Sequence, residues 1–452
     1  MSEFEDKPKK IDEDVDEKLE RIRALLPDDK PMVEISEGCS IGNIPAIANN
    51  RLFFGSCNKN FYCLDKRNGE LVWRRPVGGQ VTLSSPLIYK NMVMFGSFDK
   101  NMYALDAKTG ETIWSFRTNN EIESSPMIYK RKLYFGGLDN YVYCLDAENG
   151  ELVWKYFCTY GSSSCPTFLN GNLLFTCYDR NLYCIDAETT EVKWKFYMHL
   201  KANTTPCITD RKGNMLANSI KKEPVVAKDG LIFIGDRAGN FSCLNFDGEK
   251  VWSFFAGNMI NLSSACAENG RAYFTCFDGN IYCLSIDGKL LWKYKTGQGA
   301  ATAPLIIDNL VLAGSCDQNM YALDKETGQF KWAFHTGGII LGSANIEGKT
   351  IYFGSWDGNM YAIDTTDRKK LWSFQTSSLG QSTIMGVNFN SKEERIKFAI
   401  QTGMSRERAY ETQSDEEHDH VGFTYIKDDE KNPYLMIGKD NPYINRKKRL
   451  NP

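Results

Sequence analysis

The sequence predicts an all-β protein whose main domain is an eight-bladed β-propeller of four-stranded antiparallel blades. Three observations support this prediction. One phrase recurs: "YALDAKTGETIW" ends at Trp114, "YCLDAENGELVW" at Trp154 and "YCIDAETTEVKW" at Trp194. The closing tryptophans are 40 or 41 residues apart, except for one interval of 58. Each unit contains four short runs rich in β-branched and aromatic residues, separated by turn residues. A fixed period of this length, with four strands per unit, is typical of propellers.

Eight copies of the unit fill the chain from about residue 43 to residue 375. Because each tryptophan is a large apolar group at the same place in its unit, we expect it to fill the space between neighbouring blades. A ninth tryptophan, Trp356, lies off this register. The blade-docking residues are Trp73, Trp114, Trp154, Trp194, Trp252, Trp292, Trp332 and Trp372.

The second copy illustrates the strands expected in each blade. We predict strands over residues 84–90, 92–98, 101–106 and 112–117. The turn Asp99-Lys100-Asn101 contains residues that tolerate the positive φ of tight hairpins. In the "YCLD" phrase, cysteine alternates between copies with alanine, as at Cys144 and Ala104. A position that accepts either residue requires a small buried side chain, so these cysteines are predicted to be packing residues.

The ends of the chain depart from the repeat. Residues 1–30 are predicted to be an acidic, partly helical tail, residues 31–389 the propeller, and residues 390–432 a helical and acidic insertion or linker. Residues 433–452 are expected to form a strand pair with a basic end, which could close the propeller. The run that begins at Gln381 is a candidate extra inner strand. Because these additional strands could form one more blade, a nine-bladed propeller is the alternative to an eight-bladed one.

Composition limits the function classes. The net charge is −3, and the only basic cluster is "NRKKR" at residues 445–449, so nucleic acid is an unlikely partner. No run approaches the roughly 20 apolar residues that a membrane span needs, and the N-terminus shows no secretory signal. The 14 cysteines include no CxxC pair. Reduced cysteines in a cytoplasmic protein fit these facts best.

The repeated phrase resembles the pyrroloquinoline-quinone-like repeat family, whose tryptophan docks between blades. Members of that family include quinoprotein dehydrogenases and the lipoprotein scaffold of outer-membrane barrel assembly. A dehydrogenase would need pyrroloquinoline quinone and a calcium ion held by acidic and amide oxygens. By this resemblance, Glu123 and Asn261 are the candidate pair. The adjacent-cysteine disulfide of those enzymes is absent, so we expect neither cofactor.

The loops from each outer strand to the next inner strand lie on the face where relatives place a cofactor or partner. The residue nine positions after each tryptophan is expected near the mouth of the central channel. Only Glu123 is charged among these residues, so the mouth offers no pair of groups for general acid–base catalysis. The eight mouth residues are Thr82, Glu123, Ser163, Asn203, Asn261, Ala301, Leu341 and Gln381.

Function is therefore expected in the parts that do not repeat. The interval of 58 residues contains an insertion at residues 207–224, and long loops on rigid scaffolds often carry function. His418 and His420 are candidate metal ligands, but two histidines in a polar, acidic segment are more often solvated. The sequence favours a non-enzymatic scaffold or adaptor that binds another protein through its loop face and terminal extensions. The alternative is a propeller that binds a quinone or another small ligand and has oxidoreductase activity.

Overall fold

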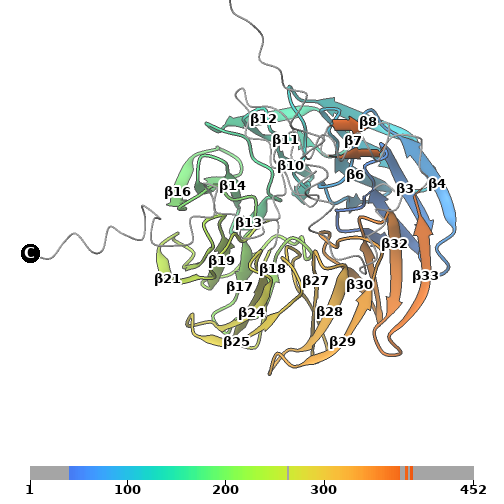
Figure 1. Ribbon diagram of the computed structural model, residues 1–452. Coiled ribbons are helices and arrows are strands. Elements are labelled where there is room, and N and C mark those ends of the chain that lie inside the picture. Colours follow the sequence, from blue (N-terminus) through green and yellow to red (C-terminus); the bar gives the residue numbers. More distant parts are fainter. Residues whose placement is uncertain (1–39, 262–263, 377–381, 385–386, 390–452) are drawn as a thin grey trace, which may run out of the picture. The chain divides into compact units, whose positions relative to one another are not determined.

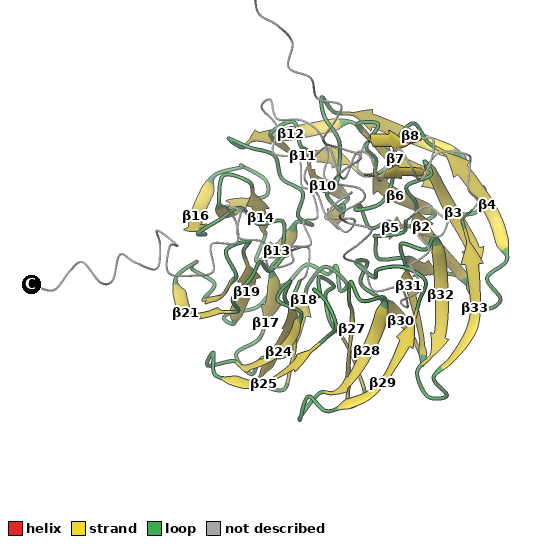
Figure 2. Cartoon of the chain, in the orientation of Figure 1, coloured by secondary structure: helices red, strands yellow, loops and turns green. Residues whose placement is uncertain are grey.

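The blades follow one another around a central axis in chain order. The structure is a computed structural model that describes residues 40–261, 264–376, 382–384 and 387–389. Eight sheets are arranged around the axis, and within each sheet the strands run in chain order from the inside outward, except in one sheet that has an additional strand at its inner edge (Figure 1). Strands and short loops account for the described residues, which contain no helix (Figure 2). The eight-bladed propeller of four-stranded antiparallel blades is confirmed.

The first four blades have strands of similar length. Blade 1 contains β1 (Ala46–Ala48), β2 (Arg51–Gly55), β3 (Asn60–Asp65) and β4 (Leu71–Pro76). Blade 2 contains β5 (Leu87–Tyr89), β6 (Met92–Gly96), β7 (Asn101–Asp106) and β8 (Thr112–Arg117). Blade 3 contains β9 (Met127–Tyr129), β10 (Lys132–Gly136), β11 (Tyr141–Asp146) and β12 (Leu152–Phe157). Blade 4 contains β13 (Thr167–Leu169), β14 (Asn172–Cys177), β15 (Asn181–Asp186) and β16 (Val192–Tyr197).

The second half includes one five-stranded blade. Blade 5 contains β17 (Cys207–Thr209), β18 (Met215–Ala217), β19 (Leu231–Gly235), β20 (Asn240–Leu244) and β21 (Lys250–Phe255). Blade 6 contains β22 (Cys266–Glu268), β23 (Arg271–Thr275), β24 (Asn280–Ser285) and β25 (Leu290–Lys295). Blade 7 contains β26 (Leu305–Ile307), β27 (Leu310–Gly314), β28 (Asn319–Asp324) and β29 (Phe330–His335). Blade 8 contains β30 (Asn345–Glu347), β31 (Thr350–Gly354), β32 (Asn359–Asp364) and β33 (Lys369–Gln375).

The ring closes by direct contact of blade 8 with blade 1. Trp372 Nε1 donates to Lys66 O at 3.0 Å, and Ile41 N donates to Ser355 O at 3.2 Å. The first of these bonds repeats the one that joins neighbouring blades elsewhere. The nine-blade alternative is therefore wrong, because blade 1 already occupies the place that a ninth blade would need.

The described part of the segment after blade 8 contains two strands, β34 (Ser382–Ile384) and β35 (Val387–Phe389), which pair with each other in a two-stranded sheet. The run from Gln381 thus contains a strand, and its position as an extra inner strand stays a prediction. The predicted tail at 1–30, the segment at 390–432 and the strand pair at 433–452 lie outside the described residues.

The repeated tryptophans lie between blades, as expected. Trp114 is 8% exposed, and its Nε1 donates to Ala147 O of the next blade at 3.3 Å. Gly150 of that blade has φ +75°, and a Cβ there would lie 2.7 Å from the Trp114 ring. Glycine here permits both the turn and the close approach of the tryptophan ring. Six further tryptophans donate to the next blade in the same way: Trp73, Trp154, Trp194, Trp252, Trp292 and Trp372.

Strand bounds match the prediction best on the outer side of the blade. Residues 101–106 and 112–117 are strands β7 and β8 as predicted. The inner strands are shorter than predicted because hydroxyl groups such as Ser84 Oγ bond to the neighbouring blade instead of continuing a ladder. The "YCLD" cysteines are buried, and burial raises the pKa of the Cys63 and Cys144 thiols to about 12. This environment agrees with a packing role.

Candidate functional site: a cavity at the centre of the propeller

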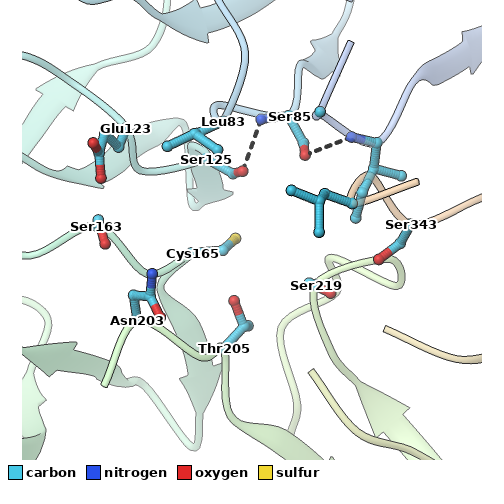
Figure 3. A pocket seen from close by; sticks show the side chains of 13 residues that line it. Leu83, Ser85, Glu123, Ser125, Ser163, Cys165, Asn203, Thr205, Ser219 and Ser343 are labelled. Carbon is cyan, nitrogen blue, oxygen red and sulfur yellow. Dashed lines mark hydrogen bonds between the residues drawn. The ribbon is translucent and has the colours of Figure 1, made fainter. Parts of the chain in front are cut away.

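A cavity of about 60 Å³ that is partly open to solvent lies among the residues just before the inner strands. Its wall combines hydroxyl, amide and small apolar groups with one carboxyl and one thiol. Figure 3 shows Glu123, Ser163 and Asn203 in a row on one side, with Ser219 and Ser343 on the opposite side. The lining residues are Gly42, Ile44, Leu83, Ser85, Glu123, Ser125, Ser163, Cys165, Asn203, Thr205, Ser219, Leu341 and Ser343.

Several hydroxyl groups in this wall have a structural role. Ser85 Oγ accepts from Ile44 N at 2.9 Å, and Ser125 Oγ accepts from Ser85 N at 2.8 Å (Figure 3). On the far side, Ser343 Oγ accepts from Ala303 N at 2.7 Å. Each bond joins the inner strands of adjacent blades and satisfies a backbone N–H that has no ladder partner there. These serines therefore hold the ring together around the cavity.

Half of the predicted mouth residues line this cavity. Glu123, Ser163, Asn203 and Leu341 are in its wall, so the offset of nine residues from the tryptophan locates the loop tips correctly. Gln381 lies outside the described residues. Thr82, Asn261 and Ala301 have described positions outside the cavity wall.

The insertion of blade 5 crosses the central channel. Its first part forms β18, a fifth strand that pairs with the inner strand β17. Beyond it, Asn218 Nδ2 donates to Ala265 O of blade 6 at 3.0 Å, and Lys222 Nζ donates to Ser85 O of blade 2 at 3.0 Å. Burial lowers the pKa of Lys222. Since blades 2 and 6 lie on different sides of the ring, the insertion narrows the channel. The sequence located this insertion without revealing that it enters the channel.

Glu123 is the only carboxyl group in the cavity wall. The residue is 6% exposed, and its Oε2 has no hydrogen-bond partner among the described residues. Burial raises the pKa of Glu123 to about 8; the positive charge of Arg237 opposes this shift and the carboxylate of Glu121 adds to it. The protonated form therefore predominates at neutral pH, and in that form the group can donate an O–H.

Arg237 is near enough to Glu123 for its charge to act on the pKa of that carboxyl, although the two residues belong to blades 5 and 3. Arg237 Nε donates to Asn261 Oδ1 at 3.2 Å. Tyr178 OH and Ser163 Oγ are 2.7 Å apart. Burial raises the pKa of Tyr178, with a further rise from Glu123 and an opposing effect from Arg237. These groups form a polar cluster on one side of the mouth, which we call the mouth cluster.

The mouth cluster does not fit the calcium site that the family resemblance implied. Asn261 Oδ1, the oxygen proposed to bind the ion, accepts a hydrogen bond from Arg237. The guanidinium charge would repel a cation at this place. Glu123 is mainly protonated and would have to ionise in a buried site before binding calcium. The candidate pair Glu123 and Asn261 therefore does not support a calcium-dependent quinone reaction.

No other metal site is found in the described ranges. No group of three or more histidine, cysteine, aspartate or glutamate residues is arranged to hold an ion there. The candidate ligands His418 and His420 lie outside those ranges. In the same part of the chain, no helix has the length and apolar character required to span a membrane.

The fold and the tryptophan contacts define a β-propeller of the pyrroloquinoline-quinone-like repeat class. The chain belongs to the family described as outer membrane protein assembly factor BamB, whose model matches residues 18–137, 126–208 and 247–397. No curated protein matches the chain significantly.

Two solved structures of low sequence identity, those with TM-scores of 0.59 and 0.56, share the fold. The computationally designed protein Ika8 is 16% identical, with a TM-score of 0.59 over 72% of this chain and 97% of its own. The quinohemoprotein alcohol dehydrogenase from Comamonas testosteroni is 14% identical, with a TM-score of 0.56 over 72% of this chain and 71% of its own. BamB from Moraxella catarrhalis is 18% identical, with a TM-score of 0.48 over 61% of this chain and 81% of its own.

Proposed function

We propose that the protein is a non-enzymatic scaffold that binds another protein at the edge of its loop face, across blades 3 to 5. One observation carries this proposal. Phe157, Tyr197 and Phe255 end the outer strands of three consecutive blades and are 61%, 61% and 63% exposed. We call these three residues the rim aromatics. The same position in the other blades holds Pro76, Arg117, Lys295, His335 and Gln375.

Packing within a blade accounts for the rim aromatics only in part. The ring centroids of Phe157 and Tyr141 are 5.6 Å apart, and Arg180 Nη1 donates to Tyr197 OH at 3.4 Å, yet the three rim side chains remain largely exposed. Strands β12, β16 and β21 succeed one another along the outside of the ring (Figure 1). Large aromatic groups exposed on neighbouring elements mark protein-binding surfaces more often than isolated apolar residues do. Tyr160, in the loop after β12, adds a further exposed aromatic group, at 59%.

Basic residues accompany the aromatic residues on two of these strands. Lys155 and Lys195 are exposed, and their ammonium groups lie 4.2 Å and 4.6 Å from the ring centroids of Tyr141 and Tyr183. Each lysine precedes its rim aromatic by two residues and so lies on the same side of the strand. A complementary partner therefore presents acidic and apolar residues.

The outer strands also supply backbone groups for binding. Strands β12 and β16 are the outer edges of their sheets, without a further strand beyond them in the described structure. An extended segment can pair with such an edge while its side chains contact the aromatic groups. This mode fits a partner that contributes a strand.

Site-specific photo-cross-linking tests the proposal in native extract. A photoreactive residue at position 157, 197 or 255 is expected to capture one common protein, whereas the same residue at Lys295 or Arg117 is expected not to capture it. The triple variant Phe157→Ser, Tyr197→Ser and Phe255→Ser should fold and lose the partner in a competition experiment. Equal capture at Lys295, or full competition by the triple variant, would contradict the scaffold proposal.

Location in the cytoplasm forms part of the same proposal. All thirteen cysteines in the described ranges are free and buried, which supports a reducing compartment. The alternative, a quinone-binding oxidoreductase, is tested by adding pyrroloquinoline quinone with calcium. Binding to the folded state would raise the melting temperature. We expect no rise, and a rise that Glu123→Ala abolishes would favour the alternative.

A further inference from the structure

Two repeated positions at the mouth each contain a single charged residue. The first is the position nine residues after the tryptophan, where Glu123 is the only charged residue of eight. The second position lies in the hairpin between the second and third strands of each blade. It is held by the residue whose backbone N–H donates to a carbonyl of the preceding loop, as Arg237 N does to Lys201 O. Arg237 is the only charged residue in that series of eight. The other members are Cys57, Phe98, Leu138, Tyr178, Phe277, Cys316 and Trp356.

These two exceptions come together in the mouth cluster. Glu123 and Arg237 are two blades apart, yet each influences the protonation of Tyr178, and Arg237 also acts on Glu123. Their charged atoms are not within ion-pair distance of each other in the described structure. Packing cannot account for a carboxyl and a guanidinium at places where the other blades use neutral residues.

Three polar atoms of the mouth cluster have no hydrogen-bond partner among the described residues. They are Glu123 Oε2, Arg237 Nη2 and Asn261 Nδ2. Glu123 is 6% exposed and Asn261 is 1% exposed, so solvent reaches these side chains poorly. Leaving such groups unpaired costs stability, and several unpaired groups at one place indicate an external partner.

The unpaired groups of the mouth cluster are mainly hydrogen-bond donors. Arg237 and Asn261 offer N–H groups, and the protonated Glu123 offers an O–H. A guanidinium recognises a carboxylate by parallel, charge-assisted hydrogen bonds. The adjacent cavity of about 60 Å³, whose wall includes Glu123 and Ser163 and which is partly open to solvent, leaves space for a short chain attached to the carboxylate.

We propose that the mouth cluster binds a small organic carboxylate, with the carboxylate held by Arg237 and Asn261 and an oxygen accepting from Glu123. The inference goes beyond the scaffold function and involves a different surface, because the rim aromatics are at the outer ends of the blades. Binding at the mouth cluster and binding at the rim aromatics can therefore be tested separately.

Calorimetric titration of the full chain with succinate tests this site. Succinamide, its neutral analogue, controls for shape, and inorganic phosphate controls for charge. Wild-type protein should bind succinate and should bind succinamide and phosphate at least about tenfold more weakly, since loss of one charge-assisted contact costs that factor or more. Absence of succinate binding, or equal binding of phosphate, would overturn the proposal.

Two variants assign the binding to the mouth cluster. Arg237→Phe introduces the residue that Phe98 and Phe277 provide in other blades, so it should fold and lose succinate binding by about tenfold or more. Lys293→Ala also removes one positive charge, but from an exposed outer strand, and should bind as the wild type does. Unchanged succinate binding in Arg237→Phe would show that succinate binds elsewhere and would overturn the proposal.

Discussion

The tryptophan contacts and the mouth cluster are built from the same repeat but follow opposite rules. Between blades, Trp114 and six of its counterparts donate to a carbonyl of the next blade, so repetition preserves one structural contact around the ring. At the mouth, Glu123 and Arg237 each depart from their series and leave polar atoms without partners. The difference indicates that repeated residues specify the fold and that departures from the repeat carry binding.

The largest expected effect comes from removing a docking tryptophan. Trp114→Ala should lower the free energy of unfolding by about 3–5 kcal/mol, because a large cavity would remain between two blades. Trp356, in a hairpin at the mouth, is only partly buried, and Trp356→Ala should cost less than half as much. Urea unfolding of both variants measures the difference. The reverse order would show that the blades do not depend on the repeated tryptophan.

A smaller effect should appear in the pH dependence of stability. The pKa of Glu123 is about 8 in the folded state against an ordinary value of 4.5. The folded state therefore keeps the proton more strongly, so the stability from the neutral carboxyl is present below pH 4.5 and is lost as the pH rises to 8. This loss amounts to a few kcal/mol at about 1.4 kcal/mol per pH unit.

Glu123→Gln removes this loss. Its stability relative to the wild type should rise between pH 5 and pH 8, as measured by urea unfolding at several pH values. Glu151→Gln, at an exposed position, is the matched control and should show no such trend. A parallel pH profile for wild type and Glu123→Gln would mean that Glu123 is ionised in the folded protein.

The smallest expected effect lies in the turn that faces each tryptophan. Blade 4 has Thr190 with φ +62° where blade 3 has Gly150 with φ +75°. Since a Cβ in this conformation costs roughly 1 kcal/mol, Thr190→Gly should stabilise the protein by up to about that amount. The exchange Gly150→Thr should destabilise it by more, because its side chain would also displace Trp114. Thermal unfolding checks both signs, and stabilisation by Gly150→Thr would contradict the account.

The fold was predictable because period and turn chemistry repeat along the chain. Strand β7 begins and ends where the sequence predicts, since Asp99 and Asn101 mark its hairpin. The inner strands were overestimated, because their pattern is apolar while the hydroxyl groups before them bond to other blades. Such contacts between units 40 residues apart leave no local signal.

The candidate site was predictable only in part. The offset from each tryptophan located Glu123 at the cavity, because all eight loops have similar geometry. Arg237 was missed, although it is the only charged residue in the aligned hairpins. Its proximity to Glu123 depends on the curvature of the ring between blades 3 and 5, which no local pattern reveals. The sequence did not predict that the insertion crosses the channel for the same reason, because Lys222 contacts blade 2, which is far away in the sequence.

One variant tests the central claim that departures from the repeat serve binding and not folding. It combines Phe157→Lys, Tyr197→Lys, Phe255→Lys and Arg237→Phe. The new lysines match Lys295 at the rim position of blade 6, and the new phenylalanine matches Phe277 at its hairpin position. Its free energy of unfolding should stay within about 1 kcal/mol of the wild type, because three changes are at exposed positions and the fourth introduces the phenylalanine found at the equivalent hairpin position of blade 6. Partner competition and succinate binding should both be lost. Destabilisation as large as that of Trp114→Ala, or full retention of both binding activities, would contradict the claim.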